Sequence, residues 1–222
     1  MPLELNKKEL AFAEKIISIG MKKASEAMTF FTREKVLIKD MKIEIKDFSL
    51  INKFSTKITD EPTVILTTQL IGELSGYSYL LFSKSDVTKF SELCIPKQYQ
   101  NNSEDSKKML DSLLLEIDNI LSASVITQFS NLLKVKIYGG VPDLKILKTS
   151  ELSSYISDKL ENPSYMLCID CDFSNNNTTL NPQFIWLLDA EFLSKIKEAS
   201  NDNTFIETVN QQYNSINDNR AN

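Results

Sequence analysis

The sequence predicts an α/β (α+β) fold of two layers, in which two long helices pack side by side on a mostly antiparallel sheet. Two long segments, residues 7–31 and 113–133, have apolar residues at helical spacing. Each is followed by three strand-like stretches and a short helix, so the order helix–strand–strand–strand–helix occurs twice. We therefore expect one internally duplicated domain with pseudo-two-fold symmetry, because the repeat is too long for a solenoid unit.

The first half begins with the helix at residues 7–31, for which Asn6 is the expected N-cap. Stretches rich in β-branched and aromatic residues predict strands at residues 36–45, 64–71 and 77–82. The first of these strands is rich in lysine, which is typical of an edge strand protected by charge. A short helix over residues 84–93, capped by Ser83, ends the half.

The second half begins with the helix at residues 113–133 and repeats the pattern. A strand is expected at residues 135–138, with residues 143–147 continuing extended after a Gly139-Gly140 break. Further strands are expected at residues 165–173 and 184–188, with short helices at 150–160 and 190–199. The two halves also end alike, since YSYLLFSKSDVTKFSEL corresponds to QFIWLLDAEFLSKIKEA. We expect a single domain over residues 1–200, with pseudo-repeats at about 7–94 and 108–199. Residues 201–222 are expected to form a C-terminal helix and tail, disordered from Asn214 onward.

Composition excludes several classes of function. The net charge is −5, and no basic stripe interleaved with aromatic residues is present, so we expect no nucleic-acid partner. The sequence has no signal peptide, and no apolar run approaches the length of about 18 residues that a membrane span requires. A cytoplasmic location away from membranes is therefore expected. It has no histidine, the commonest general base and metal ligand. Its glycines form no common phosphate-binding loop.

The cysteines do not predict a metal site. Cys168 and Cys171 form a C-x-x-C pattern, but they lie within YMLCIDCDF, which reads as a strand. Residues three apart on a strand point to opposite faces, and no second cysteine pair is available to complete a zinc site. We therefore expect buried thiols and no bound metal.

The most site-like feature is a narrow polar stripe on the helix at residues 113–133, opposite its apolar face. The stripe consists of Glu116, Asn119, Ala123, Thr127 and Ser130. Glu116 and Asn119 are neighbours on the helix surface, and Ala123 leaves the surface beside them low. Asp118 falls near the apolar face and therefore needs a partner or an edge position. An ordinary solvated helix face is the alternative interpretation of the stripe.

These residues resemble a known family. A helix-borne E-x-x-N, followed by a strand and a Gly/Pro break and duplicated in one chain, is similar to the CheC/CheX/FliY phosphatases of chemotaxis. The best match is SLLLEIDNILSASVITQFSNLLKVKIYGGVP, residues 112–142. The resemblance covers residues 7–199 and implies a CheC-like fold.

The resemblance also implies an activity, namely hydrolysis of the aspartyl phosphate on a phosphorylated CheY-like receiver. Glu116 then docks against a lysine of the receiver, and Asn119 orients the attacking water. Ala123 and Thr127 belong to the partner-binding surface. The chain needs no cofactor of its own, because the receiver carries the Mg²⁺. A second partner suggested by the family is the deamidase CheD.

The family often has one site in each half. Aligning the two long helices places Glu14 opposite Glu116 and Ile17 opposite Asn119, so the first site lacks its amide and is expected to be inactive. A non-catalytic function remains open, because the fold also resembles the middle domain of the flagellar switch protein FliM. In that alternative the chain is an adaptor that binds a receiver, CheD or another chemotaxis partner.

Overall fold

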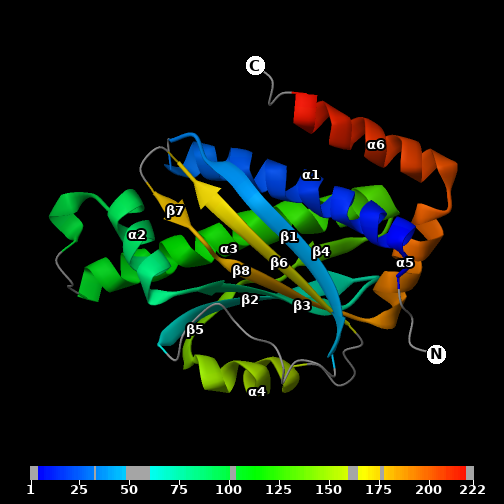
Figure 1. The fold of residues 1–222 in the computed structure, drawn as a ribbon. Helices are drawn as coiled ribbons and strands as arrows, with labels where there is room; N and C mark the ends of the chain where they lie inside the picture. The colour runs from blue at the N-terminus through cyan, green and yellow to red at the C-terminus, as the bar shows by residue number, and fades with distance from the viewer. Residues whose placement is uncertain are drawn as a thin grey trace.

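The computed structural model describes residues 5–32, 34–48, 61–100, 104–159, 165–175 and 178–218 (Figure 1). The α-helices are α1 (Lys7–Thr32), α2 (Lys84–Cys94), α3 (Glu104–Leu133), α4 (Leu152–Ser157), α5 (Ala190–Ser200) and α6 (Asn203–Asp218). The strands are β1 (Leu37–Asp47), β2 (Pro62–Gly72), β3 (Gly76–Phe82), β4 (Ile137–Gly139), β5 (Asp143–Lys148), β6 (Tyr165–Ser174), β7 (Thr179–Leu180) and β8 (Gln183–Leu188). Short 3₁₀ turns lie at Lys97–Tyr99 and Thr149–Glu151.

The strands form one antiparallel sheet whose order reflects the duplication. The order is β1-β6-β8-β3-β2-β4, with β5 also paired to β2 and β7 to β6. Counted inward from the two edges of the sheet, β1 corresponds to β5, β6 to β2, and β8 to β3. The pseudo-two-fold axis therefore passes between β3 and β8, whose sequences were the best match between the halves. The predicted fold class is confirmed.

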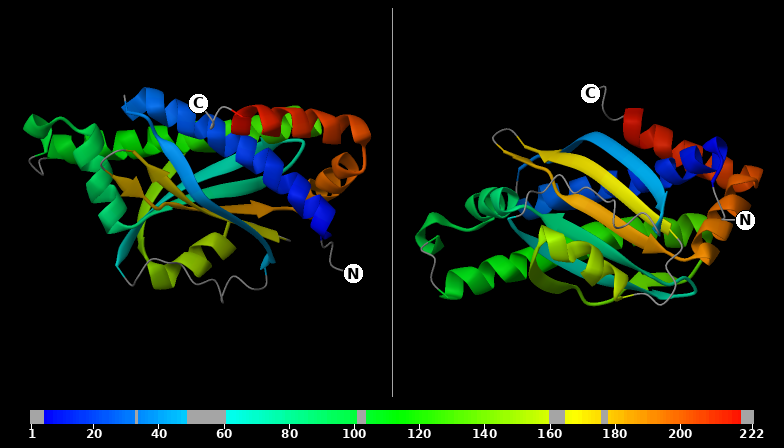
Figure 2. Two further views of the ribbon diagram at one scale, coloured as in Figure 1. Left: turned by 45° about the horizontal axis from the view of Figure 1, so that its top comes forward. Right: turned by 60° about the horizontal axis from the view of Figure 1, so that its bottom comes forward.

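The two faces of the sheet are covered differently. Helices α1 and α3 lie on one face and the short α4 lies on the other (Figure 2). The larger core fills the space beneath the long helices, where the Phe129 ring lies 4.8 Å from the Phe192 ring and 6.0 Å from the Trp186 ring, centroid to centroid. A smaller apolar cluster, including Tyr79 and Leu152, lies on the α4 side. Trp186 is fully buried, and the lysine-rich β1 is an edge strand, as predicted.

The two long helices approach each other closely at one glycine. A Cβ atom at Gly20 of α1 would lie 2.9 Å from the Cα atom of Val125 of α3, closer than a side chain allows. The missing side chain therefore lets the backbones meet. At the start of α1, the amides of Lys8 and Glu9 donate to the Asn6 side chain, which confirms the predicted cap.

Three boundaries differ from the sequence-based predictions. Helix α3 begins at Glu104, nine residues before the expected start, because Leu110 and Leu113 continue the packing against the core. The stretch after α3 forms two short strands, β4 and β5, which pair with different parts of β2. The expected disorder from Asn214 onward is wrong as far as Asp218, because α6 continues to that residue and Ile216 packs against the core. Residues 219–222 lie outside the described residues.

Candidate functional site

Helix α3 presents four side chains to solvent along one line. Glu116, Asn119, Ala123 and Thr127 are all exposed. Their spacing of three, four and four residues keeps them on one face of a helix with 3.6 residues per turn. We call these four residues the site stripe. The other sides of α3 are held by the core, since Leu114, Ile117, Leu121 and Val125 are buried.

The side chains of Glu116 and Asn119 are free to bind a partner. Within the described ranges, neither side chain makes a hydrogen bond or an ion pair. At i and i+3 they stand side by side on the helix surface, so both can reach one partner. Ser130, by contrast, is only partly exposed, and its hydroxyl donates to the Val135 carbonyl at 2.7 Å. This hydrogen bond stabilises the C-terminal end of α3. Ser130, which was part of the predicted polar stripe, therefore does not belong to the site stripe.

Beneath the same turn of α3, a carboxyl group is buried against the sheet. Asp118 has no exposed surface, and its two oxygens accept from Thr68 at 2.6 Å and from Ser122 at 3.1 Å. Ser122 in turn lies 3.1 Å from the hydroxyl of Ser78 on β3. Burial raises the pKa of Asp118 to about 6, although the two hydrogen bonds act in the opposite direction. The sequence indicated that Asp118 needs a partner, but it did not identify Thr68, Ser78 or Ser122.

Beside α3, the β4 edge of the sheet carries exposed apolar side chains. Ile71 of β2 pairs with Tyr138 of β4, and Val141 follows in the connection to β5. Their exposed fractions are 36%, 59% and 93%, which is high for large apolar residues. We call these three residues the edge patch. A Cβ atom at Gly139 would lie 3.2 Å from the Ile126 side chain, so this edge packs directly against the second half of α3. Sequence reasoning missed the edge patch, because a β4 pairing only three residues long has no clear alternation.

The corresponding residues of α1 do not form a matching surface. Ile17, the counterpart of Asn119 in the alignment, is fully buried, and Glu14 is half-buried. Helix α6 packs along α1, where the Lys15 ammonium donates to Asn210 at 2.7 Å and lies 5.8 Å from the centre of the Tyr213 ring. Figure 1 shows α6 lying over α1. Glu14 and Ile17 therefore do not form an exposed pair comparable to Glu116 and Asn119.

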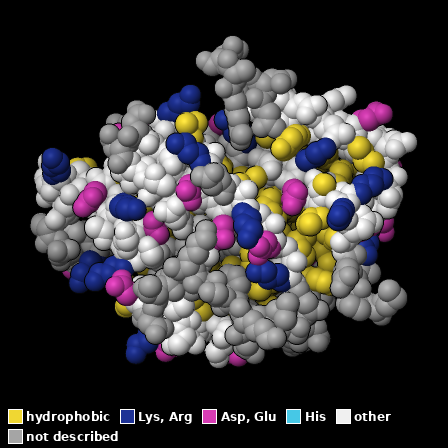
Figure 3. Space-filling model, in the orientation of Figure 1, with side chains coloured by type: hydrophobic (Ala, Val, Ile, Leu, Met, Phe, Trp, Pro, Cys, Tyr) yellow, Lys and Arg dark blue, Asp and Glu magenta, His cyan; other side chains and the backbone are white. Residues whose placement is uncertain are grey.

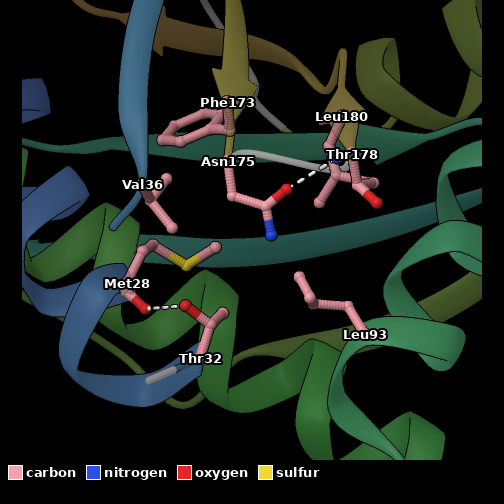
Figure 4. Close-up of a pocket in the computed structure, with 8 residues that line it drawn as sticks. All are labelled: Met28, Thr32, Val36, Leu93, Phe173, Asn175, Thr178 and Leu180. Carbon is pink, nitrogen blue, oxygen red and sulfur yellow. Dashed lines mark hydrogen bonds between the residues drawn. The ribbon is translucent and has the colours of Figure 1, made fainter. Parts of the chain in front are cut away.

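A hollow at the end of α1 is too small to be a substrate pocket. Figure 4 shows it between α1, α2, β6 and β7, lined by Met28, Thr32, Val36, Leu93, Phe173, Asn175, Thr178 and Leu180. Its volume of about 10 Å³ is what a single water molecule requires. Asn175 in its wall already accepts from the Thr178 amide at 2.6 Å. This hollow does not fit a small-molecule substrate.

In the described residues no three His, Cys, Asp or Glu side chains come together in a way that could hold a metal ion. Cys168 and Cys171 contribute to the clusters on opposite faces of the sheet, as the strand geometry predicted. None of the helices in the described ranges has the length and hydrophobicity that crossing a bilayer requires. On the face seen in Figure 3, acidic and basic side chains are interspersed and form no continuous basic stripe.

Comparisons with known proteins agree with this fold. No family model and no curated protein sequence matches the chain. Among solved structures, Thermotoga maritima FliY superposes with a TM-score of 0.68 at 18% sequence identity, covering 87% of this chain and 96% of FliY. FliM from a FliM–SpeE complex of H. pylori gives a TM-score of 0.60 at 13% identity, covering 88% of this chain and 97% of FliM.

A chemotaxis protein of the CheX type is also similar. CheX from Desulfovibrio desulfuricans gives a TM-score of 0.50 at 8% identity, with 78% of this chain and 99% of CheX covered. The chain therefore has the CheC-like fold of these chemotaxis and flagellar proteins, as the resemblance in its sequence predicted. Because all three identities are below 25%, the similarity concerns the fold.

Proposed function

We propose that this protein is a phosphatase that removes the phosphoryl group from the aspartate of a CheY-type receiver in the cytoplasm. The observation that carries this proposal is the exposed and unoccupied pair Glu116 and Asn119 on α3 of a CheC-like fold. The chain has no histidine, and the described residues include no cluster that could hold a metal ion. The pair suits a macromolecular substrate that brings its own reactive phosphate.

The chemistry requires positioning more than activation. An aspartyl phosphate is a reactive acyl phosphate, so a water molecule held in line with the bond to phosphorus can displace the carboxylate. The products are the free aspartate of the receiver and inorganic phosphate. The carboxamide of Asn119 can accept from this water and donate to a phosphoryl oxygen. Charge on the phosphate is neutralised by the Mg²⁺ that the receiver carries.

Glu116 has a separate role in this proposal. Its carboxylate pairs with a lysine of the receiver and so places Asn119 over the phosphate. Ala123 and Thr127 continue the contact along α3, where small side chains permit close approach. The edge patch adds apolar contact area along the second half of α3, which fits the usual combination of an apolar centre with polar anchors at protein interfaces.

The experiment is a rapid-quench measurement of the decay of a phosphorylated receiver in the presence of Mg²⁺. Asn119→Ala should lower the hydrolysis rate at saturating protein by about 100-fold and leave receiver binding nearly unchanged, because the amide acts mainly in the transition state. Glu116→Ala should also weaken binding. Matched controls are Asn131→Ala, an exposed asparagine on the same helix, and Glu207→Ala, an exposed glutamate on α6. Wild-type activity in Asn119→Ala would refute the catalytic role.

A non-catalytic adaptor is the second candidate. The observation in its favour is that the FliM structure superposes better than CheX, with TM-scores of 0.60 and 0.50. In this case the protein binds a receiver, CheD or another chemotaxis partner through the site stripe without accelerating hydrolysis. Binding of a phosphorylated receiver without any acceleration of its decay is the expected result for an adaptor.

A further inference from the structure

A polar cluster is buried where α3 meets the sheet, directly beneath the candidate site. Thr68 of β2, Ser78 of β3, and Asp118 and Ser122 of α3 are each no more than 2% exposed. They are linked by hydrogen bonds of 2.6 Å and 3.1 Å to the Asp118 carboxyl group and by a 3.1 Å contact between the two serines. We call these four residues the Asp118 cluster. The side chains around it on this face of α3, including Leu114, Leu121 and Val125, are apolar.

Stability alone does not account for this cluster. A buried carboxyl group requires several hydrogen bonds to offset its loss of hydration, and an apolar side chain of similar size is often equally or more stabilising. What hydrogen bonds add is direction and a narrow range of distance. Apolar contacts tolerate a small rotation or slide of the helix, whereas the bond from Thr68 of β2 to Asp118 and the contact of Ser78 of β3 with Ser122 hold this turn of α3 at one place on the sheet.

That place determines where the site stripe stands. Asp118 lies in the same helical turn as Glu116 and Asn119, so any rotation of α3 about its axis moves all three together. The side-chain ends lie about 6 Å from the axis, so a rotation of about 20° displaces them by about 2 Å. A misplacement of even about 1 Å can lower a reaction rate by about 100-fold when positioning is the main contribution.

We propose that the Asp118 cluster is a positioning device that fixes the rotation of α3 on the sheet and thereby places Asn119 and Glu116 for the receiver. Asp118 is thus a positioning residue that does not touch the substrate. This inference rests on the proposed phosphatase function for its effect on rate. Its effect on α3 itself does not depend on that function.

The test compares variants of the full chain by two readouts. Asp118→Leu removes both hydrogen bonds, Thr68→Val removes the 2.6 Å bond while keeping the shape of the side chain, and Asp118→Asn retains hydrogen-bonding capacity. The matched control is Ser25→Ala, which removes a buried serine hydroxyl on α1 that donates to Val36 at 2.6 Å, away from α3. If Asp118→Leu fails to fold, Thr68→Val carries the comparison.

The first readout is phospho-receiver decay under single-turnover conditions. Asp118→Leu and Thr68→Val should lower the rate at saturating protein by about tenfold or more and weaken receiver binding by a smaller factor, because Glu116 moves together with Asn119. Asp118→Asn should stay within about threefold of wild type. An unchanged rate in both Asp118→Leu and Thr68→Val, or an equal fall in Ser25→Ala, overturns the proposal.

The second readout is amide hydrogen exchange of peptides covering residues 112–127, which requires no activity. Faster exchange there in Thr68→Val, with α1 peptides unchanged, is the expected result. Unchanged exchange overturns the positioning role. If wild-type protein fails to accelerate phospho-receiver decay, the phosphatase function is refuted, and hydrogen exchange alone decides whether the Asp118 cluster fixes α3.

Discussion

Replacing Asp118 by asparagine should remove a pH dependence from the stability of the protein. The folded state raises the pKa of this carboxyl group from 3.8 to about 6, chiefly by burial. The folded protein therefore holds the proton more tightly than the unfolded chain does between these two pH values. The contribution of Asp118 to the free energy of unfolding is therefore fully present below about pH 4 and is lost as the pH rises through about 6.

The magnitude follows from the difference between the two pKa values. They differ by about two, and each pKa unit corresponds to about 1.4 kcal/mol, so the total loss is about 3 kcal/mol. About half of it falls between pH 5 and pH 7.5. Asparagine has no proton to lose and resembles the protonated acid. Between pH 5 and pH 7.5, the free energy of unfolding of Asp118→Asn should therefore rise by about 1.5 kcal/mol relative to that of wild type. A change of this size shifts the Tm of a chain this long by about 3–6 °C.

Urea unfolding at the two pH values measures this difference directly. Trp186 is the only tryptophan and is fully buried, so its fluorescence reports unfolding of the core. Other titrating groups are common to both proteins and cancel in the comparison. Asp111→Asn, an exposed aspartate on the same helix, controls for the loss of a charge. A difference between wild type and Asp118→Asn that is the same at both pH values would refute the account of a buried, titrating carboxyl group.

Two further predictions concern the surfaces around the site. Ile17→Asn should not create a second active site and should lower the free energy of unfolding by about 3 kcal/mol or more, because it buries an amide in an apolar contact. Urea unfolding checks it against the exposed Ala11→Asn on the same helix, and an unchanged stability contradicts it. Val141→Asp should weaken receiver binding and change stability by less than about 0.5 kcal/mol, because this side chain is 93% exposed. Titration of a labelled receiver measures the binding, with Leu37→Asp at the opposite edge of the sheet as control, and equal affinities for wild type and Val141→Asp count against the edge patch.

The local pattern of the sequence was sufficient for most helices and strands. Apolar residues at helical spacing located α1 and most of α3, and the duplication predicted the repeated order of elements that the sheet confirms. The same pattern placed Glu116, Asn119, Ala123 and Thr127 on one polar line, and all four are exposed. These features depend on residues within a few turns of one another, so the local periodicity of a single sequence is enough to predict them.

Other features were decided only by contacts between distant parts of the chain. Asp118 accepts from Thr68 of β2, 50 residues away, and its helical neighbour Ser122 contacts Ser78 of β3, so no periodicity identifies these links to the sheet. The cover of α1 comes from α6, because Lys15 meets Asn210 across 195 residues. The split of the β4–β5 stretch likewise depends on its pairing with β2. The sequence by itself determined which faces of the long helices are polar, whereas the tertiary structure decided which of those faces remains open, since openness depends on what packs there from elsewhere in the chain.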